Sequence, residues 1–200
     1  MLSRVDDLGV SGYVVISYDG VVDGAGYRPG RGEERALAFL ADAYEGVATP
    51  AGKGLEHARA VADVLSVNGY DEQLQLVALL HDVVEDTSRE VSDVRAAFGG
   101  DVAAMVQALS EDATVAPYAR RKRALRETIA AAGRPVVDVA LADKIAILRH
   151  AQLTGTRVPK RKLAHYRATL ALAAAADEAP RLRPELEALL ATFPGPSDDT

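Results

Sequence analysis

Apolar residues recur every three or four positions along most of the chain from Glu33 onward. This spacing gives a helix one apolar face, and it therefore predicts a series of amphipathic α-helices. The first predicted helix begins at residue 33, and the others cover residues 58–65, 74–81, 91–98, 102–109, 118–132, 135 to the break at 154–159, 163–176 and 184–193. Asn68-Gly69 ends the second helix, and Asp71 stands where the N-cap of the third is expected. The pattern predicts an all-α helical bundle over residues 33–192.

The two ends of the chain follow a different pattern. Val14-Val15-Ile16 is a short β-prone run, and Asp19-Gly20 is typical of a turn, so that residues 1–32 are predicted to form a small hairpin or a loose arm. The glycines that follow lack the G-x-G-x-x-G spacing of a dinucleotide-binding loop, and we interpret them as a linker. Gly52-Lys53-Gly54 lacks the Ser or Thr of a phosphate-binding P-loop. Residues 193–200 are predicted to form a flexible tail.

Length and composition limit the classes of function. A chain of 200 residues fits one domain, and without cysteine a bound transition metal needs nitrogen and oxygen ligands. The net charge of −6 gives no basic excess for binding a nucleic-acid polymer. No apolar run approaches the roughly 20 residues of a membrane span, and the first residues lack the apolar core of a signal peptide. We expect a cytoplasmic protein that binds a small molecule and no membrane, and the sequence leaves its oligomeric state open.

Four residues from three predicted helices form a candidate metal site: His57, His81, Asp82 and Asp143. Adjacent residues on a helix point about 100° apart, so His81 and Asp82 reach one ion only in a groove where helices converge. Mixed imidazole and carboxylate ligands suit Mn²⁺, Fe²⁺ or Zn²⁺. An isolated His-Asp pair is more often an ordinary core or surface pair, so the pair alone does not decide the matter.

The residues after this pair strengthen the metal-site hypothesis. Glu85 and Asp86 repeat the polar positions of His81 and Asp82 one helical turn later. Four polar residues that follow an apolar run are costly to bury unless they bind something. A second pair of carboxylates beside a metal can orient or deprotonate an attacking water molecule. The alternative is that Glu85 and Asp86 only solvate the end of a helix.

Three motifs in this order resemble those of HD-domain hydrolases: Gly54-Leu55-Glu56-His57, Leu79-Leu80-His81-Asp82-Val83-Val84-Glu85-Asp86-Thr87 and Leu141-Ala142-Asp143-Lys144. Within this family, the chain is most similar to RelA/SpoT-type alarmone hydrolases, including the small single-domain ones, from about Glu33 to about Leu190. The resemblance implies an all-helical HD bundle, Mn²⁺ as the cofactor, and removal of pyrophosphate from the 3′ position of guanosine tetraphosphate. It also implies that Glu85 and Asp86 act on the attacking water together with the metal.

The chain departs from the family pattern at two places. The family has basic residues between its first helix and the first ligand, whereas this chain has Gly46-Val47-Ala48-Thr49-Pro50 and retains only Lys53. The family also has an Asn four residues after the last ligand, where this chain has Ile147. Because Ile147 lies one turn after Asp143, we expect it to face the same pocket without making the hydrogen bond of an Asn. We therefore expect altered substrate contacts.

Several other residues are candidates for binding the substrate. Arg121 and Lys122 either hold phosphate groups or belong to a solvated helix face, and Lys144 lies next to the last ligand. Tyr166 either stacks on a base or packs in the core. We interpret His150 and His165 as ordinary surface or packing residues.

Three functions remain open at this point. The first is a metal-dependent phosphohydrolase that removes pyrophosphate from an alarmone nucleotide. The second is an HD hydrolase of another nucleotide or of a small phosphorylated metabolite. The third is a binding module that senses a nucleotide without hydrolysing it, although such a module has less reason to keep both pairs of carboxylates.

Overall fold

The computed structural model describes residues 30–49, 53–174 and 181–195, and every regular element within these ranges is a helix. The helices are α1 (Arg31–Ala43), α2 (Leu55–Val67), α3 (Glu72–Leu80), α4 (Val83–Asp86), α5 (Val91–Phe98), α6 (Gly100–Leu109), α7 (Tyr118–Ala132), α8 (Arg134–Thr154), α9 (Lys160–Ala174) and α10 (Arg183–Ala191). The prediction of an all-α bundle is confirmed. The predicted hairpin around residues 14–22 and residues 196–200 of the predicted tail lie outside the described residues.

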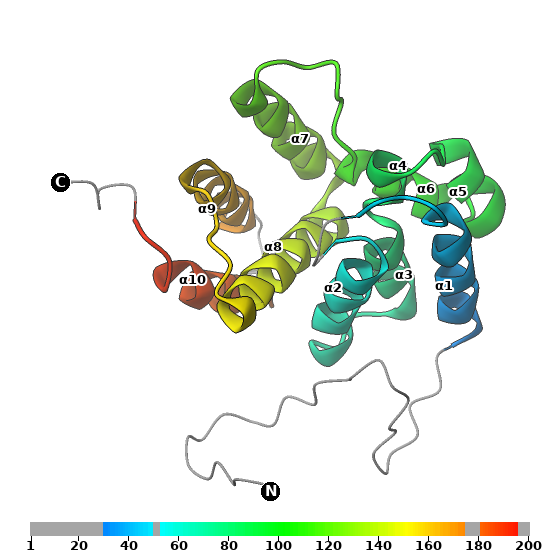
Figure 1. The fold of residues 1–200 in the computed structure, drawn as a ribbon, viewed down its shortest axis with the longest axis horizontal. Helices are drawn as coiled ribbons and strands as arrows, with labels where there is room; N and C mark the ends of the chain where they lie inside the picture. The colour runs from blue at the N-terminus through cyan, green and yellow to red at the C-terminus, as the bar shows by residue number, and fades with distance from the viewer. Residues whose placement is uncertain (1–29, 50–52, 175–180, 196–200) are drawn as a thin grey trace, which may run out of the picture.

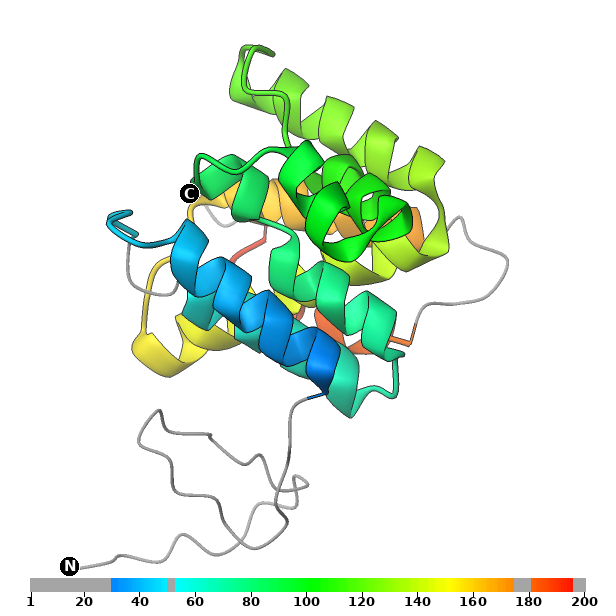
Figure 2. The same cartoon turned by 90° about the vertical axis from the view of Figure 1, so that its right-hand side faces the viewer.

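Helix α8 runs through the middle of the molecule and contacts helices on both of its sides (Figure 1). On one side it packs against α2 and α3, and α1 covers the outer face of α3 (Figure 2). On the other side it packs against α7, α9 and α10. Helix α6 contacts both α3 and α7. Within the described residues, no helix combines the length and the apolar character that crossing a membrane requires.

The central position of α8 explains its unusual pattern of residues. A helix that is surrounded by other helices is apolar on all faces, and Val136 to Ala146 are buried without interruption. Leu141, Ile145 and Leu148 are among the largest side chains with no exposed surface. Three charged residues interrupt this apolar helix and are also buried: Asp138, which pairs with Arg134, and the neighbours Asp143 and Lys144. Buried charged residues in such surroundings need partners, and those of Asp143 and Lys144 form the site described below.

Local signals at the ends of two helices set the position of the first candidate ligands. Gly54 begins α2 with a φ of 68°, and a Cβ there would come within 3.2 Å of Thr49 side-chain atoms. A glycine at this position avoids both the backbone strain and the close contact, and α2 can start three residues before His57. Asp71 caps α3, as predicted, by accepting a hydrogen bond of 2.8 Å from the amide of Leu74.

The predicted helix bounds need three corrections. The first helix begins at Arg31, two residues inside the segment assigned to the arm. The helix that carries the acidic cluster is broken, because α3 ends at Leu80 and a turn at His81-Asp82 precedes the short helix α4. Helix α10 ends at Ala191 instead of Phe193. The break after Leu80 therefore separates His81 and Asp82 from the short helix that carries Glu85 and Asp86.

Candidate metal centre

The four candidate ligands come together where α2, the turn after α3, and α8 meet. His57 Nε2 lies 3.0 Å from Asp143 Oδ1 and 3.9 Å from Asp82 Oδ2. His81 Nε2 lies 3.2 Å from Asp82 Oδ1 and 4.0 Å from Asp143 Oδ1. Two imidazoles and two carboxylates thus surround one small volume, although they lie up to 86 positions apart in the sequence.

His81 is oriented by a partner outside this cluster. Its Nδ1 lies 2.7 Å from the carbonyl oxygen of Ala78, which can only accept a hydrogen bond, so Nδ1 carries a proton. Its Nε2 is buried and makes no hydrogen bond to any of the described residues. An imidazole whose Nδ1–H is held by a backbone carbonyl and whose Nε2 faces carboxylates has the arrangement of a metal-binding histidine.

The donor set fits a divalent metal ion. Within the described residues, one nitrogen each of His57 and His81 and one carboxylate oxygen of Asp143 lie within 4.8 Å of one another, and all three residues are buried. Nitrogen and oxygen ligands lie about 2.0–2.2 Å from an ion such as Zn²⁺, so two ligands of one ion are separated by up to about 4 Å. Movements of these three side chains by a few tenths of an ångström are enough to bring all three within bonding distance of one ion. Asp82 lies at the edge of this group of three residues.

The charges of the cluster are strongly coupled. Burial favours the neutral form of His81, but the adjacent Asp82 outweighs it and raises the His81 pKa to about 9. Burial likewise opposes ionisation of Asp143, but Lys144 and His57 lower the pKa of this carboxyl well below its ordinary value. Lys144 forms an ion pair with Asp143 Oδ2. The carboxylates are therefore ionised in the form that binds a cation.

Glu85 and Asp86, which are predicted to act together on the attacking water, occupy different positions. Glu85 lines the pocket beside the cluster, and its Oε1 accepts a hydrogen bond of 2.5 Å from the amide of Glu111. Desolvation by the surrounding protein and the negative charge of Asp82 raise its pKa to about 7. Asp86 is not part of the pocket lining, and its Oδ2 accepts a hydrogen bond of 3.3 Å from the hydroxyl of Tyr44. The two residues are adjacent on α4, and adjacent residues of a helix point about 100° apart, so only one of them faces the pocket.

The pocket extends from the cluster toward α7 and α9, and it contains all the predicted substrate-binding candidates. The candidates in its lining are Lys53, Arg121, Lys122, Lys144, Ile147 and Tyr166. Lys53 Nζ lies 3.4 Å from Asp82 Oδ2 at the near end of the pocket. Arg121 and Lys122 both form ion pairs with the carboxylate of Glu111, so they are not part of a freely solvated face. Ile147 faces the pocket, as predicted from its spacing.

Tyr166 packs in the core and also lines the pocket. Only 3% of the residue is exposed, which agrees with core packing, yet it also lines the pocket. The ammonium of Lys144 lies 5.6 Å from the centre of its ring, within the range of a cation–π contact. Lys144 therefore contacts both the tyrosine ring and the carboxylate of Asp143.

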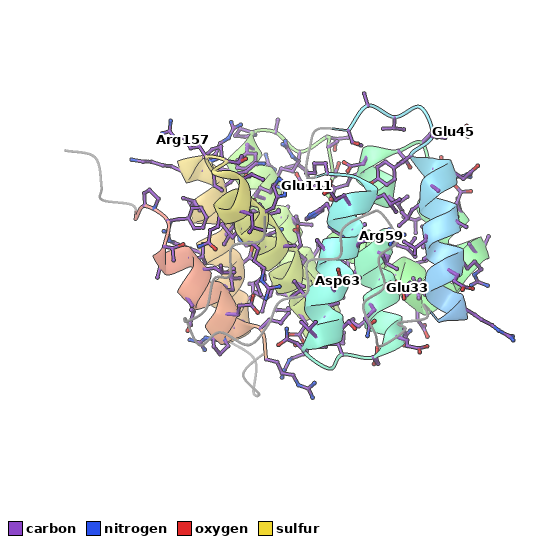
Figure 3. The ribbon with its side chains drawn as sticks, turned by 60° about the horizontal axis from the view of Figure 1, so that its bottom comes forward. Glu33, Glu45, Arg59, Asp63, Glu111 and Arg157 are labelled. Atoms are coloured by element: carbon purple, nitrogen blue, oxygen red, sulfur yellow. The ribbon has the colours of Figure 1, made fainter. Side chains whose placement is uncertain are left out.

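Four polar residues of the pocket were not predicted from the sequence: Glu111, Tyr118, Lys162 and His165. Glu111 lies on the connection between α6 and α7 (Figure 3), where no periodic pattern points to it. Lys162 lies four positions before Tyr166, and this spacing indicates that the two residues share a helix face. His165 directly precedes Tyr166, and its spacing gives no such indication. His165 was interpreted as an ordinary packing or surface residue. It is buried, but it belongs to the pocket wall.

Comparison with known proteins agrees with this geometry. A family profile described as "HD domain" matches residues 36–172, which include all four candidate ligands. The chain belongs to the HD domain family. Among solved structures, an HD-like bundle described as a metazoan ortholog of SpoT that hydrolyzes ppGpp superposes with a TM-score of 0.67 at 26% identity, over 84% of this chain and 98% of that one. The structure of lmo0812 from Listeria monocytogenes EGD-e gives a TM-score of 0.59 at 25% identity, over 67% of this chain and 95% of that one.

Curated relatives of this HD domain include alarmone hydrolases. The guanosine-3′,5′-bis(diphosphate) 3′-pyrophosphohydrolase MESH1 of Drosophila melanogaster is 37% identical over 101 residues, which are 50% of this chain and 56% of the fly protein. The bifunctional (p)ppGpp synthase/hydrolase SpoT of Escherichia coli K12 is 38% identical over 78 residues, which are 38% of this chain and 11% of SpoT. The match to the MESH1 proteins spans about half of their length.

Proposed function

We propose that this HD domain is a metal-dependent phosphohydrolase that removes pyrophosphate from the 3′ position of guanosine tetraphosphate or of a closely related nucleotide. The observation that carries the proposal is the convergence of His57, His81, Asp82 and Asp143 at the end of a pocket lined with basic residues. The names of the MESH1 and SpoT relatives support the choice of substrate.

His57, His81, Asp82 and Asp143 would hold the divalent ion, and we propose Mn²⁺ as the ion that is used. Imidazole and carboxylate ligands without a thiolate suit Mn²⁺. When bound, the ion supplies positive charge that polarises a phosphoryl oxygen and lowers the pKa of a water molecule. Ala78 fixes the ring of His81, and Lys144 fixes the carboxylate of Asp143, so that two ligands are oriented before the ion binds.

Glu85 is the residue that we propose to take the proton from the attacking water. It lines the pocket next to the cluster, and the pKa of about 7 matches that of a base that works near neutral pH. The amide of Glu111 holds one of its oxygens and leaves the other for the water. Asp86 has a supporting role, because it contacts Tyr44 and lies outside the pocket lining.

The basic residues of the pocket bind the phosphate groups of the substrate. Lys53 and Lys144 lie beside the metal ligands, and Arg121, Lys122 and Lys162 line the rest of the pocket. The carboxylate of Glu111 pairs with both Arg121 and Lys122. A phosphate group carries charge and acceptor oxygens like those of this carboxylate, so it can replace Glu111 as their partner. The polyanionic substrate therefore fits the pocket better than an uncharged metabolite does.

A panel of nucleotides tests the proposal. The purified chain is stripped of metal, reloaded with Mn²⁺, and incubated with guanosine tetraphosphate, guanosine triphosphate and a deoxynucleoside triphosphate, with phosphate and pyrophosphate measured separately. The proposal predicts that pyrophosphate is released from guanosine tetraphosphate only when Mn²⁺ is present. Faster turnover of another member would reassign the substrate to that nucleotide. No turnover of any member, with tight binding of one, would favour the binding module.

A further inference from the structure

His165 lies on α9 and forms part of the pocket wall that faces α7. Only 5% of the residue is exposed. Arg126, on α7, places Nη1 2.8 Å from His165 Nδ1. Because a guanidinium group has donors and no acceptor, Nδ1 must accept this hydrogen bond, and the ring proton therefore lies on Nε2.

The ring also carries no net charge. Burial lowers the pKa of His165 to about 3, and the positive charges of Lys144 and Lys122 act in the same direction. His165 is thus a neutral imidazole at physiological pH, in a tautomer that is set by Arg126. It has one N–H donor, at Nε2. The hydrogen bond from Arg126 to Nδ1 fixes the orientation of the ring and therefore the direction of this donor.

This donor has no partner within the part of the chain that the structure describes. His165 Nε2 is buried and makes no hydrogen bond to any of these residues. His81 Nε2 is also buried, but it faces Asp82 Oδ1 at 3.2 Å, whereas no such group of the described residues faces His165 Nε2. A buried donor without a partner costs free energy, so such groups are usually satisfied by something outside the chain. The N–H of His165 therefore needs an acceptor.

The charges around His165 select the kind of acceptor. Lys122 and Lys144 are the charged groups that act most strongly on its ring, and both line the same pocket. Burial and the charge of Lys144 also lower the pKa of Lys122 to about 8, so these two cations repel each other across the pocket. An oxygen that is held between two ammonium groups and an N–H donor is favoured if it is negatively charged.

We propose that His165 donates a hydrogen bond from Nε2 to a phosphate oxygen of the substrate, and that Arg126 acts as the positioning residue that directs this donor. The inference rests on the proposed function, because it concerns the same pocket. It adds a neutral, directional donor to the lysines, which attract phosphate from many directions. A directional donor binds a phosphate group well only at one position. His165 would therefore favour nucleotides that carry a phosphate group at that position over nucleotides that do not.

Ring nitrogen NMR of the full-length, Zn²⁺-loaded protein tests the inference, with Zn²⁺ chosen because it is diamagnetic. The spectrum should show His165 as the neutral Nε2–H tautomer from pH 6 to 8. Saturating inorganic pyrophosphate should shift the Nε2–H signal, whereas guanosine should not. No shift with either ligand, or a shift with guanosine alone, would overturn the assignment of a phosphate oxygen. Because this spectrum uses the wild-type protein, the result does not depend on whether any variant folds.

Calorimetric titration with pyrophosphate compares two matched variants. His165→Phe keeps an aromatic ring but removes the donor, and it should weaken binding roughly 10- to 100-fold, as expected for a hydrogen bond to a charged acceptor. His150→Phe, at a half-buried position of α8 outside the pocket lining, should leave the affinity unchanged. Equal affinities of the two variants would contradict the proposal.

Variants of Arg126 test the positioning role separately. Arg126→Leu should produce a mixture of His165 tautomers and weaken pyrophosphate binding, and Arg126→Lys should restore both because an ammonium also donates to Nδ1. An unchanged tautomer in Arg126→Leu would contradict this role. Failure of the inference is distinguishable from failure of the proposed function. Turnover of guanosine tetraphosphate without any response of His165 removes only the inference, and a shift of His165 without turnover removes only the activity.

Discussion

The Nδ1 of His81 donates a hydrogen bond of 2.7 Å to the carbonyl oxygen of Ala78, one turn earlier in the chain. This bond uses the nitrogen that faces away from the carboxylates, and it leaves Nε2 directed at Asp82 and Asp143. The break between α3 and α4 lies at this residue. The local backbone thus prepares an imidazole for a metal ion.

Metal content is the first prediction. The purified chain should bind one divalent ion, and His81→Ala or Asp143→Ala should weaken its binding at least 100-fold, because each variant removes a ligand that no described neighbour replaces. Elemental analysis after dialysis measures the loss. His150→Ala is the matched control, since this histidine lies outside the pocket lining, and it should keep the full metal content. Unchanged metal in both ligand variants would show that the ion binds elsewhere.

The two acidic residues after the turn should differ in their effect on catalysis. Glu85→Gln should retain the metal and lower kcat by about 10²- to 10⁴-fold, the usual contribution of a general base. Asp86→Asn should have a much smaller effect, because it lies outside the pocket lining and its amide oxygen can still accept from Tyr44. Steady-state kinetics, with metal content measured in the same samples, decides between them. A larger loss in Asp86→Asn would mean that Asp86 is the base.

The sequence was sufficient to predict most of the fold and the identity of the cluster. Helical periodicity located most helices within a few residues, because each has a buried face against α8 or its neighbours. The break at His81-Asp82 was missed, since Leu79, Leu80 and Val83 continue the apolar pattern through it. Only the structure shows that Glu85 enters the pocket and Asp86 does not.

The pocket wall opposite the metal centre was harder to predict. Arg126 and His165 are 39 positions apart, and only the packing of α7 near α9 brings them together. The role of Glu111 depends on the path of a loop, which apolar periodicity does not describe. In contrast, Ile147 was placed in the pocket because Asp143 lies on the same regular helix. Regular spacing on one helix therefore placed Ile147, whereas the path of a loop and the packing of α7 near α9 are visible only in the structure.

Restoring an amide at position 147 should improve the use of guanosine tetraphosphate. Ile147 lines the pocket one turn after Asp143, and its apolar side chain offers no hydrogen bond to a nucleotide bound there. An unmade hydrogen bond costs about 1–3 kcal/mol, so Ile147→Asn should raise kcat/KM by roughly 5- to 150-fold. Ile147→Leu is the control of similar size without an amide. No gain in the Asn variant would show that this chain recognises the nucleotide by other contacts.

The metal-free protein should lose stability through Glu85 as the pH rises. The folded-state pKa of about 7 lies above the ordinary value of 4.5. The folded protein therefore retains a proton that the unfolded chain releases. The contribution of Glu85 to stability is full below about pH 4.5 and is lost as the pH rises through about 7. The difference in unfolding free energy between the wild type and Glu85→Gln should fall across this range in urea titrations. A difference that does not change with pH would contradict the raised pKa.

The most direct test of the central claim is ³¹P NMR of guanosine tetraphosphate during incubation with the Mn²⁺-loaded chain in H₂¹⁸O, with the metal removed before the spectra are recorded. The account predicts pyrophosphate that carries one ¹⁸O atom and guanosine diphosphate that carries none, because water attacks phosphorus and the bond to the ribose 3′ oxygen breaks. It also predicts no product with the His81→Ala chain. Release of single phosphates, ¹⁸O on the nucleoside product, or equal turnover by the His81→Ala chain would contradict it.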